Sequence, residues 1–401
     1  MLLFKYTENS NFENASPMRS DLVIQGWTSI MWVERFLRPG EFELIAPLAS
    51  GLREMLPGWS YITHTNSREI MVVENHDIKP QQDTGPILTI TGRSLDVLLQ
   101  ERLLGYDAVD YRTGNGTGWD KKTHTINSGN AGNKIKQLIE ESITDQQKSD
   151  GMPFVGLSVV KDTPIADGNT LPAMSLDVTG QTIHSVVSEI AKSNHLGFAI
   201  DRKIDPDEKA TFLISEGRDR ARRVSFSNEE GELKSADYFY SIRNRKNVVF
   251  WTSTWLQGSY PRDITPLDIP DSVRMIYLDF SDLDSDVERS DGQDDNAIPD
   301  TLTSQKRASI VSAAEVRAAR QLESGHDLEI TNVTIAPNTI RFQFRKDYLL
   351  GDLVGVIGSY STKSKMRVIE HVEVEDSQGT QNYPTLEAYP GIDMQEGGLN
   401  E

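Results

Sequence analysis

Apolar and polar residues alternate at both ends of the chain, which is the pattern of half-buried β-strands. Near the carboxyl end, Ile340, Phe342 and Phe344 share one face of a predicted strand, and the polar residues between them share the other. Near the amino end, residues 70–73 and 87–91 are apolar or β-branched and are flanked by polar or turn residues. The pattern therefore predicts strands at both ends.

The run over 342–356 predicts a strand, a short turn and a second strand. Turn-type residues, Asp347 and Gly351, lie between its two apolar parts. Residues 354–357, 366–374 and 383–388 predict further strands. Together they are enough for a compact antiparallel barrel.

Three stretches have apolar residues at helical spacing. The clearest is 182–194, and 133–143 follows the same rule. A third, alanine-rich helix is predicted over 301–324. Its expected buried positions are Ile310, Val311, Ala314 and Leu322. Ser94 is expected to be the N-cap of a short fourth helix.

The order of these elements predicts a β-rich α+β fold, with two antiparallel β-barrel-like domains flanking a mixed α/β middle region. A chain of this length is expected to form several domains. The expected segments are an N-terminal barrel-like domain (1–105), a mixed α/β domain (106–220), a strand-rich and helical connecting domain (221–326) with an acidic loop (279–300), a C-terminal barrel-like domain (327–392) and a tail (393–401).

The chain is acidic, with a formal net charge of −19 and a sequence pI of about 4.9. Binding to duplex DNA through phosphate neutralisation requires a basic face. We therefore expect no stable nucleic-acid binding, although like charge would let DNA pass an acidic wall without sticking. Acidity is also ordinary among soluble proteins, so both interpretations stay open.

Cysteine is absent, which excludes disulfides, thiolate zinc sites and a cysteine nucleophile. This absence fits assembly in a reducing cytoplasm. No signal-peptide pattern follows the first residues. No apolar run approaches the roughly 20 residues that span a bilayer, so we expect no membrane span.

No motif for catalysis or for cofactor binding stands out in the sequence. The glycine-rich stretch 114–118 lacks the Gly-Lys-Ser/Thr ending of a phosphate-binding loop, so a flexible loop is favoured there. The sequence contains neither a His-Glu-x-x-His nor a Gly-x-Ser-x-Gly pattern. We therefore expect no cofactor, no metal centre and no catalytic residue.

The acidic run 279–300 has aspartates at alternate positions, a spacing that calcium loops use. The glycine that such a loop needs at its sixth position is replaced by Val287. We expect a loop that faces solvent or a channel, with adventitious divalent-ion binding as the alternative. The acidic side chains assigned to this loop are Asp282, Asp284, Asp286, Asp291, Asp294 and Asp295.

Aromatic residues gather near two of the predicted strand regions. Aromatic side chains are enriched at protein interfaces and are equally at home in barrel cores, so both interpretations stay open. The candidate interface residues are Trp27, Trp32, Phe36, Arg93, Asp347 and Tyr348.

Four short motifs occur in order along the chain. They are the aromatic-rich run 27–44 with Pro39-Gly40-Glu41-Phe42, Gly92-Arg93-Ser94-Leu95 with Arg102 downstream, the run 276–283, and Asp347-Tyr348-x-x-Gly351-Asp352-Leu353-Val354. In this order they resemble the baseplate-hub, or tail-associated, proteins of siphophages, the long-tailed bacteriophages. The resemblance covers nearly the whole chain.

The resemblance implies a homotrimeric ring at the tip of the virion tail, assembled in the cytoplasm of the host bacterium. Two barrel-like domains in each of three subunits would match a hexamer of distal tail protein. The ring would close or gate the DNA channel, contact the C-terminus of the tape-measure protein and carry a tail fibre or tip protein. The resemblance names no catalytic residue.

Two alternative functions stay open from the sequence. One is a receptor-binding or carbohydrate-binding tip protein that uses exposed aromatic residues. The other is a cell-wall polysaccharide hydrolase, for which no catalytic constellation is found. Because the sequence ends at Glu401, soon after the last predicted strand, we expect any host-cleaving activity to lie on another chain.

Overall fold

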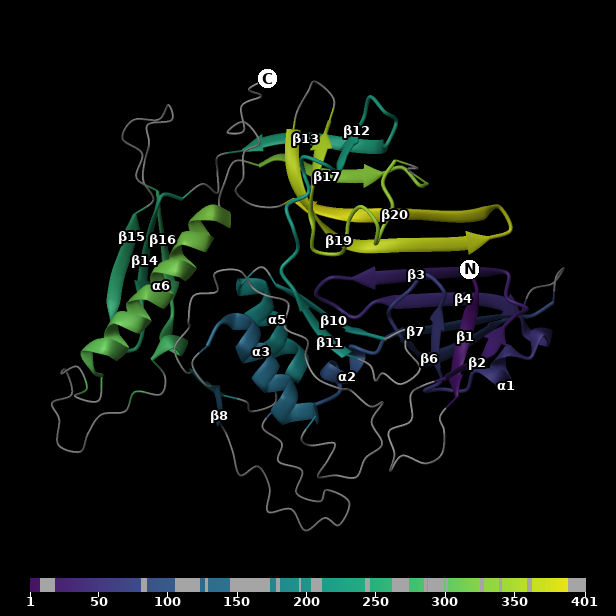
Figure 1. The fold of residues 1–401 in the computed structure, drawn as a ribbon, viewed down its shortest axis with the longest axis horizontal. Helices are drawn as coiled ribbons and strands as arrows, with labels where there is room; N and C mark the ends of the chain where they lie inside the picture. The colour runs from purple at the N-terminus through teal and green to yellow at the C-terminus, as the bar shows by residue number, and fades with distance from the viewer. Residues whose placement is uncertain are drawn as a thin grey trace, which may run out of the picture.

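The computed structural model describes both strand-rich ends and parts of the middle of the chain. Large antiparallel sheets dominate it, with few helices, as the sequence predicts (Figure 1). The described residues are 1–7, 19–80, 85–104, 123–126, 129–144, 174–177, 181–194, 196–202, 211–241, 246–261, 274–284, 287, 299, 302–324, 328–338, 341–358 and 363–388.

A 13-stranded sheet runs through both ends of the chain. Its path is β13 (Leu233–Ser241), β17 (Leu328–Ile335), β20 (Gly379–Ala388), β19 (Lys363–Asp376), β3 (Ser29–Arg35), β4 (Glu41–Pro47), β7 (Ile87–Ser94), β6 (Met71–Lys79), β5 (Tyr61–His64), β1 (Leu3–Thr7) and β2 (Arg19–Ile24). Beside this path, β12 (Ser225–Ser227) pairs in parallel with β18 (Leu353–Ile357), which pairs with β19.

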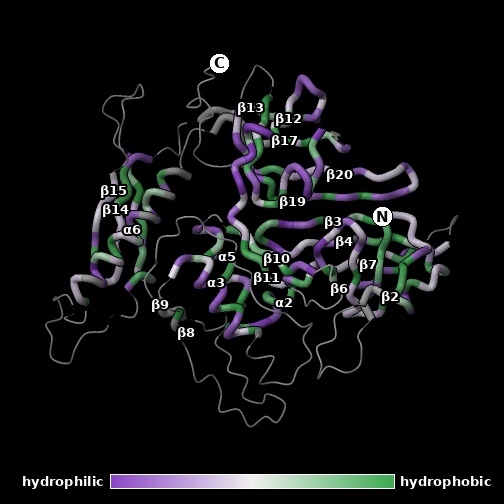
Figure 2. The backbone as a smooth tube through the Cα atoms, in the orientation of Figure 1, coloured by the Kyte–Doolittle hydropathy of each residue, from purple (hydrophilic) through white to green (hydrophobic). Residues whose placement is uncertain are grey.

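The N-terminal strands enclose one hydrophobic core. In β4 the buried residues alternate with half-buried ones, so that Phe42, Leu44 and Ala46 point inward. Trp32 of β3 packs on Phe42 in this core, with ring centroids 6.1 Å apart. Figure 2 shows apolar stretches along β2 and β7 of this region. The helices η2 (Leu48–Ser50) and α1 (Leu52–Met55) connect β4 to β5.

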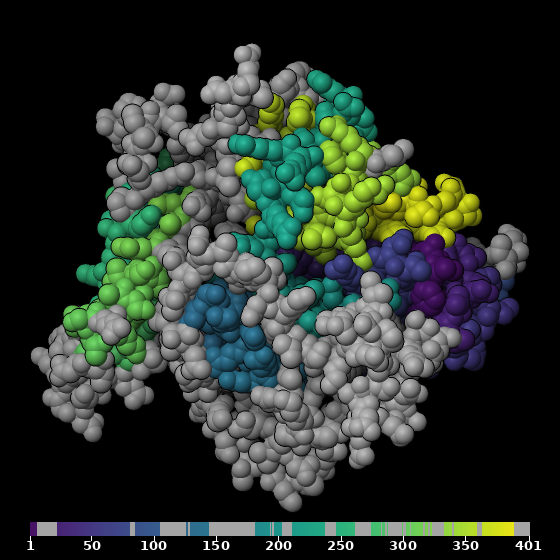
Figure 3. Space-filling view, in the orientation of Figure 1, coloured from purple at the N-terminus to yellow at the C-terminus, as the bar shows by residue number. Residues whose placement is uncertain are grey.

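The C-terminal strands enclose a separate core, built around Phe226, Tyr348 and Val356. The two ends nevertheless share one sheet, because β3 pairs with β19 from Arg35↔Glu370 to Ile30↔Glu375. Figure 3 shows the C-terminal strands lying directly against the N-terminal ones. Among the described residues the pairing follows an open path rather than a ring. The barrel-like closure of each end therefore stays a prediction.

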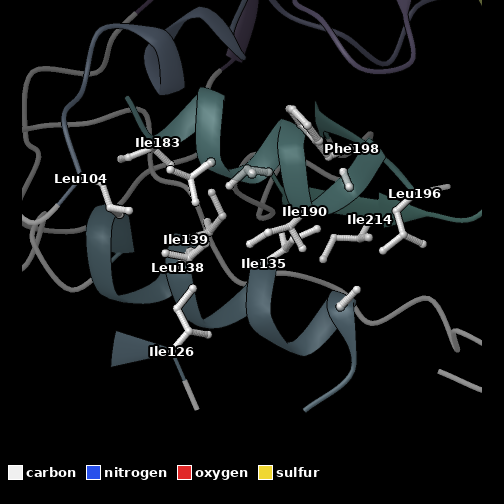
Figure 4. Close-up of a cluster of buried hydrophobic side chains, with 14 of the residues drawn as sticks. Leu104, Ile126, Ile135, Leu138, Ile139, Ile183, Ile190, Leu196, Phe198 and Ile214 are labelled. Atoms are coloured by element: carbon white, nitrogen blue, oxygen red, sulfur yellow. The ribbon is translucent and has the colours of Figure 1, made fainter. Parts of the chain in front are cut away.

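The middle region contributes two helices that pack on each other. Helix α3 (Ala131–Ile139) begins at Asn130 and helix α5 (Ile183–Ser193) at Thr182, and each N-cap side chain accepts a backbone N–H. Their apolar faces meet in Figure 4, which confirms both predicted helices. Around them lie α2 (Val97–Gln100), β8 (Thr123–Ile126), η3 (Glu140–Thr144), β9 (Met174–Asp177), β10 (Gly197–Asp201) and β11 (Thr211–Ser215).

Apart from the 13-stranded sheet and the helix pair α3 and α5, the chain forms a three-stranded sheet with one long helix on one face. Its strands are β15 (Gln257–Pro261), β14 (Val248–Thr252) and β16 (Met275–Asp279), and the helix is α6 (Ser304–Ser324), which crosses them in Figure 1. The predicted helix is confirmed, and Ile310, Ala314 and Leu322 are buried as expected. Val311 is only half-buried.

The predicted first strand of the 342–356 run is wrong, whereas its second strand is confirmed as β18. Residues 341–351 form an irregular loop in which Phe344 and Tyr348 make one isolated bridge. The Asp347 carboxylate accepts the Gln343 N–H (2.8 Å), which closes a turn where the strand was expected. The aromatic residues of this loop pack into the C-terminal core, so their burial does not need a strand.

Ser94 is not the N-cap of a helix. It is the last residue of β7, and its hydroxyl accepts the Gly40 N–H (2.9 Å). The short helix α2 begins after Asp96 instead. Sequence preference alone does not separate a capping serine from one that ends a strand.

The acidic run 279–300 begins at Asp279, the last residue of β16, and continues into the short helix η4 (Ser281–Leu283); none of its other described residues lies in a strand. The expectation of a solvated side chain is wrong at Asp284, which is fully buried. Its carboxylate accepts hydrogen bonds from Ser253 Oγ (2.5 Å) and from two backbone N–H groups of the same turn (2.9 Å each). The side chain of Asp282 and residues Asp286, Asp291, Asp294 and Asp295 lie outside the described part.

Replacing this buried carboxylate tests the correction. We expect Asp284→Ala to lower the free energy of unfolding by about 2–4 kcal/mol, because the Ser253 hydroxyl and two backbone N–H groups lose their acceptor and a buried side chain is removed. Asp279→Ala, at an exposed position of the same run, is the matched control and should change it by roughly 0.5 kcal/mol. Urea-induced unfolding measures both. Equal effects would contradict the structural role of Asp284.

Candidate functional site: a buried junction of three regions

Three regions of the chain converge at the end of β3. They are the strand end around Phe36, the segment 196–202 that contains β10, and the loop 341–352 with its supporting strands. We call this place the junction. It joins the N-terminal, middle and C-terminal regions, so it controls how they are placed relative to one another.

Phe36 is the centre of the junction. Its ring lies against two glycines from different regions: an added Cβ would come within 2.0 Å of the ring at Gly197 and within 2.2 Å at Gly351. The guanidinium carbon of Arg367 lies over the ring, 5.3 Å from its centroid. The Phe36 carbonyl also accepts the Phe198 N–H (3.3 Å). Only residues without a side chain allow the backbone at positions 197 and 351 to approach the Phe36 ring this closely.

Asp352 holds the loop beside Phe36. Its buried carboxylate accepts hydrogen bonds from the Arg218 N–H (2.7 Å), the Leu349 N–H (2.9 Å) and Arg220 Nε (3.0 Å). One carboxylate therefore ties the segment before β12 to the turn before β18. The Gly-Asp pair singled out in the sequence is thus a structural clamp.

Arg345 carries the loop across to the N-terminal region. Its guanidinium donates to Glu34 Oε2 (2.6 Å) on β3 and to the carbonyl oxygen of Asn66. The adjacent Phe344 stacks on His371 of β19, with ring centroids 3.9 Å apart. Arg345 adopts a φ of +67°, which favours glycine or asparagine, so its contacts hold a strained backbone.

Four carboxyl groups from four segments meet beside this arginine. Glu34, Glu69 and Asp96 are buried and Asp201 is partly buried. The Ser67 hydroxyl donates to Glu34 Oε1 (2.6 Å). Each group comes from a different element, so only the tertiary structure assembles the cluster.

Burial and mutual repulsion shift the pKa values of three of these carboxyl groups upward. Desolvation raises the pKa of Asp96 to about 7, against a hydrogen bond from Ser94 that lowers it. Desolvation also raises the pKa of Asp201 to about 6. The pKa of Glu69 lies well above its usual value because of desolvation and then the charge of Glu34. The junction thus holds carboxyl groups that titrate near neutral pH.

Two histidines near Arg345 stay neutral at neutral pH. Desolvation, followed by the charge of Arg345, lowers the pKa of His64 to about 3 and that of His371 to about 3. The ring of His64 makes an edge-to-face contact with Trp32, with centroids 4.6 Å apart. These rings act as packing groups rather than as proton donors.

The contacts of the junction hold three regions of the chain together. Across the described ranges, no group of three or more acidic or histidine side chains is placed to hold a metal ion. The glycine-rich stretch 114–118 lies outside them. No described helix is long and apolar enough to cross a membrane.

The predicted interface residues have different positions in the structure. Trp32, Phe36 and Tyr348 are buried within the chain, and Trp27 is half-buried against the N-terminal core. Asp347 closes its own loop. The core interpretation therefore holds for the three buried aromatic residues, whose side chains do not form an exposed surface.

Arg93 is partly exposed and forms ion pairs on the outer side of the sheet. Its guanidinium makes two hydrogen bonds to the Glu74 carboxylate (2.8 and 2.6 Å) and one to the side chain of Gln100 (2.6 Å). Its assignment as an interface residue stays a prediction.

The junction's charged residues were missed by sequence reasoning. Glu34, Glu69 and Arg345 each stand between an apolar residue and another charged residue in strand-like runs, where charged side chains usually face solvent. Nothing local marks them as buried. Their meeting depends on the pairing of segments that lie far apart in the chain.

The close approach at Phe36 is testable with one glycine and a matched control. Gly351→Ala introduces a Cβ against the ring at a φ of +86°, whereas Gly85→Ala has a φ of +81° and nothing within 4 Å. We expect Gly85→Ala to cost about 1 kcal/mol from backbone strain alone. Gly351→Ala should cost roughly 2 kcal/mol more, because the ring must move. Unfolding midpoints in urea measure both, and equal losses would contradict the contact.

The fold resembles those of three solved tail proteins. The tail protein from Neisseria meningitidis MC58 is 14% identical with a TM-score of 0.53, covering 93% of this chain and 95% of that one. The prophage MuSo2 43 kDa tail protein from Shewanella oneidensis is 13% identical with a TM-score of 0.53, covering 96% and 98%. The prophage tail protein gp18 from Listeria monocytogenes EGD-e is 9% identical with a TM-score of 0.51, covering 98% and 96%.

The sequence comparisons give the family. No curated protein matches the chain. Residues 18–386 match the family described as Siphovirus ReqiPepy6 Gp37-like protein, which covers most of the sequence. The resemblance to siphophage tail proteins is thereby confirmed, and the chain belongs to the Siphovirus ReqiPepy6 Gp37-like family.

Proposed function

We propose that the chain is a structural hub of a siphophage tail tip, which assembles as a homotrimeric ring. The observation that carries the proposal is the continuous sheet through β3 and β19, which fixes two strand-built cores at one spacing within each subunit. A closed three-fold ring of such subunits presents six strand-built units. That number fits a hexamer of distal tail protein on one side and a three-fold tip on the other.

A place in the tail tip implies which proteins the ring contacts. The ring contacts the distal tail protein hexamer, the C-terminus of the tape-measure protein and a tail fibre or tip protein. Its net charge of −19 disfavours stable nucleic-acid binding and lets DNA pass. The ring closes or gates the DNA channel, and opening is a rotation of regions about the junction. Assembly takes place in the host cytoplasm.

The role is mechanical rather than enzymatic. The acidic residues assembled by the tertiary structure are buried at the junction, where a polysaccharide has no access. A glycosidase needs two carboxyl groups on either side of an open substrate cleft. The hydrolase alternative therefore gains no support from the described residues.

Receptor or carbohydrate binding is a second candidate, favoured by one observation. On the face of the β14–β16 sheet that α6 does not cover, Phe250 and Tyr277 are paired across the strands and are 43% and 64% exposed. Met275 beside them is 55% exposed. Contiguous exposed apolar groups of this kind mark interaction surfaces.

The oligomeric state tests the hub. Light scattering of the purified chain should give the mass of three copies of the 44.9 kDa subunit, and electron microscopy of tail tips should place it in a three-fold ring. A chain that stays monomeric in solution and joins no three-fold ring in particles would rule the hub out.

Glycan binding by the isolated chain tests the second candidate. If the exposed sheet face binds carbohydrate, the double variant Phe250→Ala/Tyr277→Ala should lose at least about 1 kcal/mol of glycan affinity, because it removes the aromatic rings on which a sugar would stack. Trp59→Ala, at a 57% exposed aromatic residue elsewhere, is the control and should retain it. An absence of binding on a glycan array would remove this candidate.

A further inference from the structure

The middle region is hydrogen-bonded to the N-terminal region along a narrow strip. We call the contacts between residues 64–69 and 197–202 the seam. The Arg202 N–H donates to the Arg68 carbonyl (2.6 Å). The Arg202 guanidinium donates to two further carbonyl oxygens of segment 64–69, at 2.9 and 2.8 Å. The seam is therefore held mainly by backbone acceptors.

Three carboxyl groups lie at the seam. Glu69 and Asp201 face each other across an isolated antiparallel bridge, and Asp96 lies close enough to Asp201 and to the backbone of Ile200 for both to influence its pKa. Glu69 and Asp96 are each only 2% exposed. Oε2 of Glu69 and Oδ1 of Asp96 have no hydrogen-bond partner within the described residues. A buried carboxylate with an unsatisfied oxygen is costly, whereas a neutral carboxylic acid is much less so.

The charged groups on the surrounding elements offset this cost only in part, since desolvation outweighs the charge of Arg345 at both Glu69 and Asp201. Arg345, from the loop 341–352, is bound to Glu34 of β3, which is itself another negative group near Glu69. Arg68 is exposed, so water screens its charge. Arg202 also lowers the pKa of Asp201, although its guanidinium is hydrogen-bonded to carbonyl oxygens of segment 64–69. His64 of β5 is neutral over the neutral pH range.

We propose that the seam is a proton-dependent latch, which is closed while Glu69, Asp96 and Asp201 hold protons and loosens when these groups ionise together. Loosening frees segment 197–202 from segment 64–69. The proposal concerns the isolated chain and does not depend on the trimer. In a hub, the latch would set how easily the middle region moves at the junction.

The direction of the pH dependence follows from proton binding. The closed seam raises the pKa values of these carboxyl groups, so it retains protons that an open, solvated seam releases above pH 4. Closure is therefore favoured at mildly acidic pH and weakens as pH rises through about 6 to 7 and beyond. The buried histidines oppose this effect only below pH 6.5, their ordinary pKa, where rings exposed by opening would take up protons that the closed structure does not bind.

Amide hydrogen exchange at pH 6.0 to 8.5 measures the latch directly, since this range lies largely above the histidine window. After correction for the intrinsic chemical rate, we expect the amide of Arg202, which is bonded across the seam, to exchange about tenfold faster at pH 8.5 than at pH 6.0. Amides of β18, which lies outside the seam, should show no corrected change. The full chain is used throughout.

Variants that keep the shape but remove the charge separate the latch from general alkaline loosening. Glu69→Gln and Asp96→Asn should each reduce the pH dependence at Arg202, and the triple variant that adds Asp201→Asn should abolish it. Asp77→Asn, at an exposed position of β6, is the control and should leave the wild-type profile intact.

Two outcomes would overturn the latch. One is a wild-type profile that is flat between pH 6.0 and 8.5 at the seam. The other is a pH dependence that keeps its full wild-type size in both single variants. If either variant fails to fold, the wild-type profile and the remaining variant still decide between these outcomes.

Discussion

The antiparallel pairing of β3 with β19 is the constraint that the rest of the structure depends on. It joins strands whose paired residues Arg35 and Glu370 lie 335 positions apart, and the same two side chains form an ion pair at 2.8 Å. Loop-closure entropy grows only slowly with chain length, so a full strand pairing can offset it. Once formed, this pairing sets Phe36 at the end of β3, where Gly197 and Gly351 close on its ring.

The junction combines close apolar contact with buried charge, and the two have different consequences. The Phe36 contacts depend on shape and are insensitive to pH. Burying the carboxyl groups of Glu34, Glu69 and Asp96 costs free energy. Among these three, Arg345 forms an ion pair with Glu34, and it offsets the cost directly only there. A protein that needed only stability would be expected to use apolar residues here. Buried ionisable groups suit a junction whose stability changes with pH.

Elements whose signal is local were predicted well, and elements whose state depends on distant contacts were not. The helices α3, α5 and α6 have apolar residues at helical spacing, and this spacing already defines the face that packs. The loop 341–351 alternates as a strand would, yet its aromatic residues are buried by a core formed from other segments. Asp284 shows the same limit. An acidic run is expected to be solvated, yet the Asp284 carboxylate accepts backbone N–H groups from a turn elsewhere in the chain.

The sequence by itself determined the β-rich character, the helices, several strands and the ordered motifs that mark the family, because each of these is written in residues close together in the chain. Only the tertiary structure decided that both ends share one sheet, that Asp352 and Arg345 bind residues of other regions, and that four carboxyl groups meet. The physical reason is the distance along the chain over which each interaction acts. Periodicity and turn preference act over a few residues, whereas strand partners and buried charge clusters are chosen by packing across the whole chain.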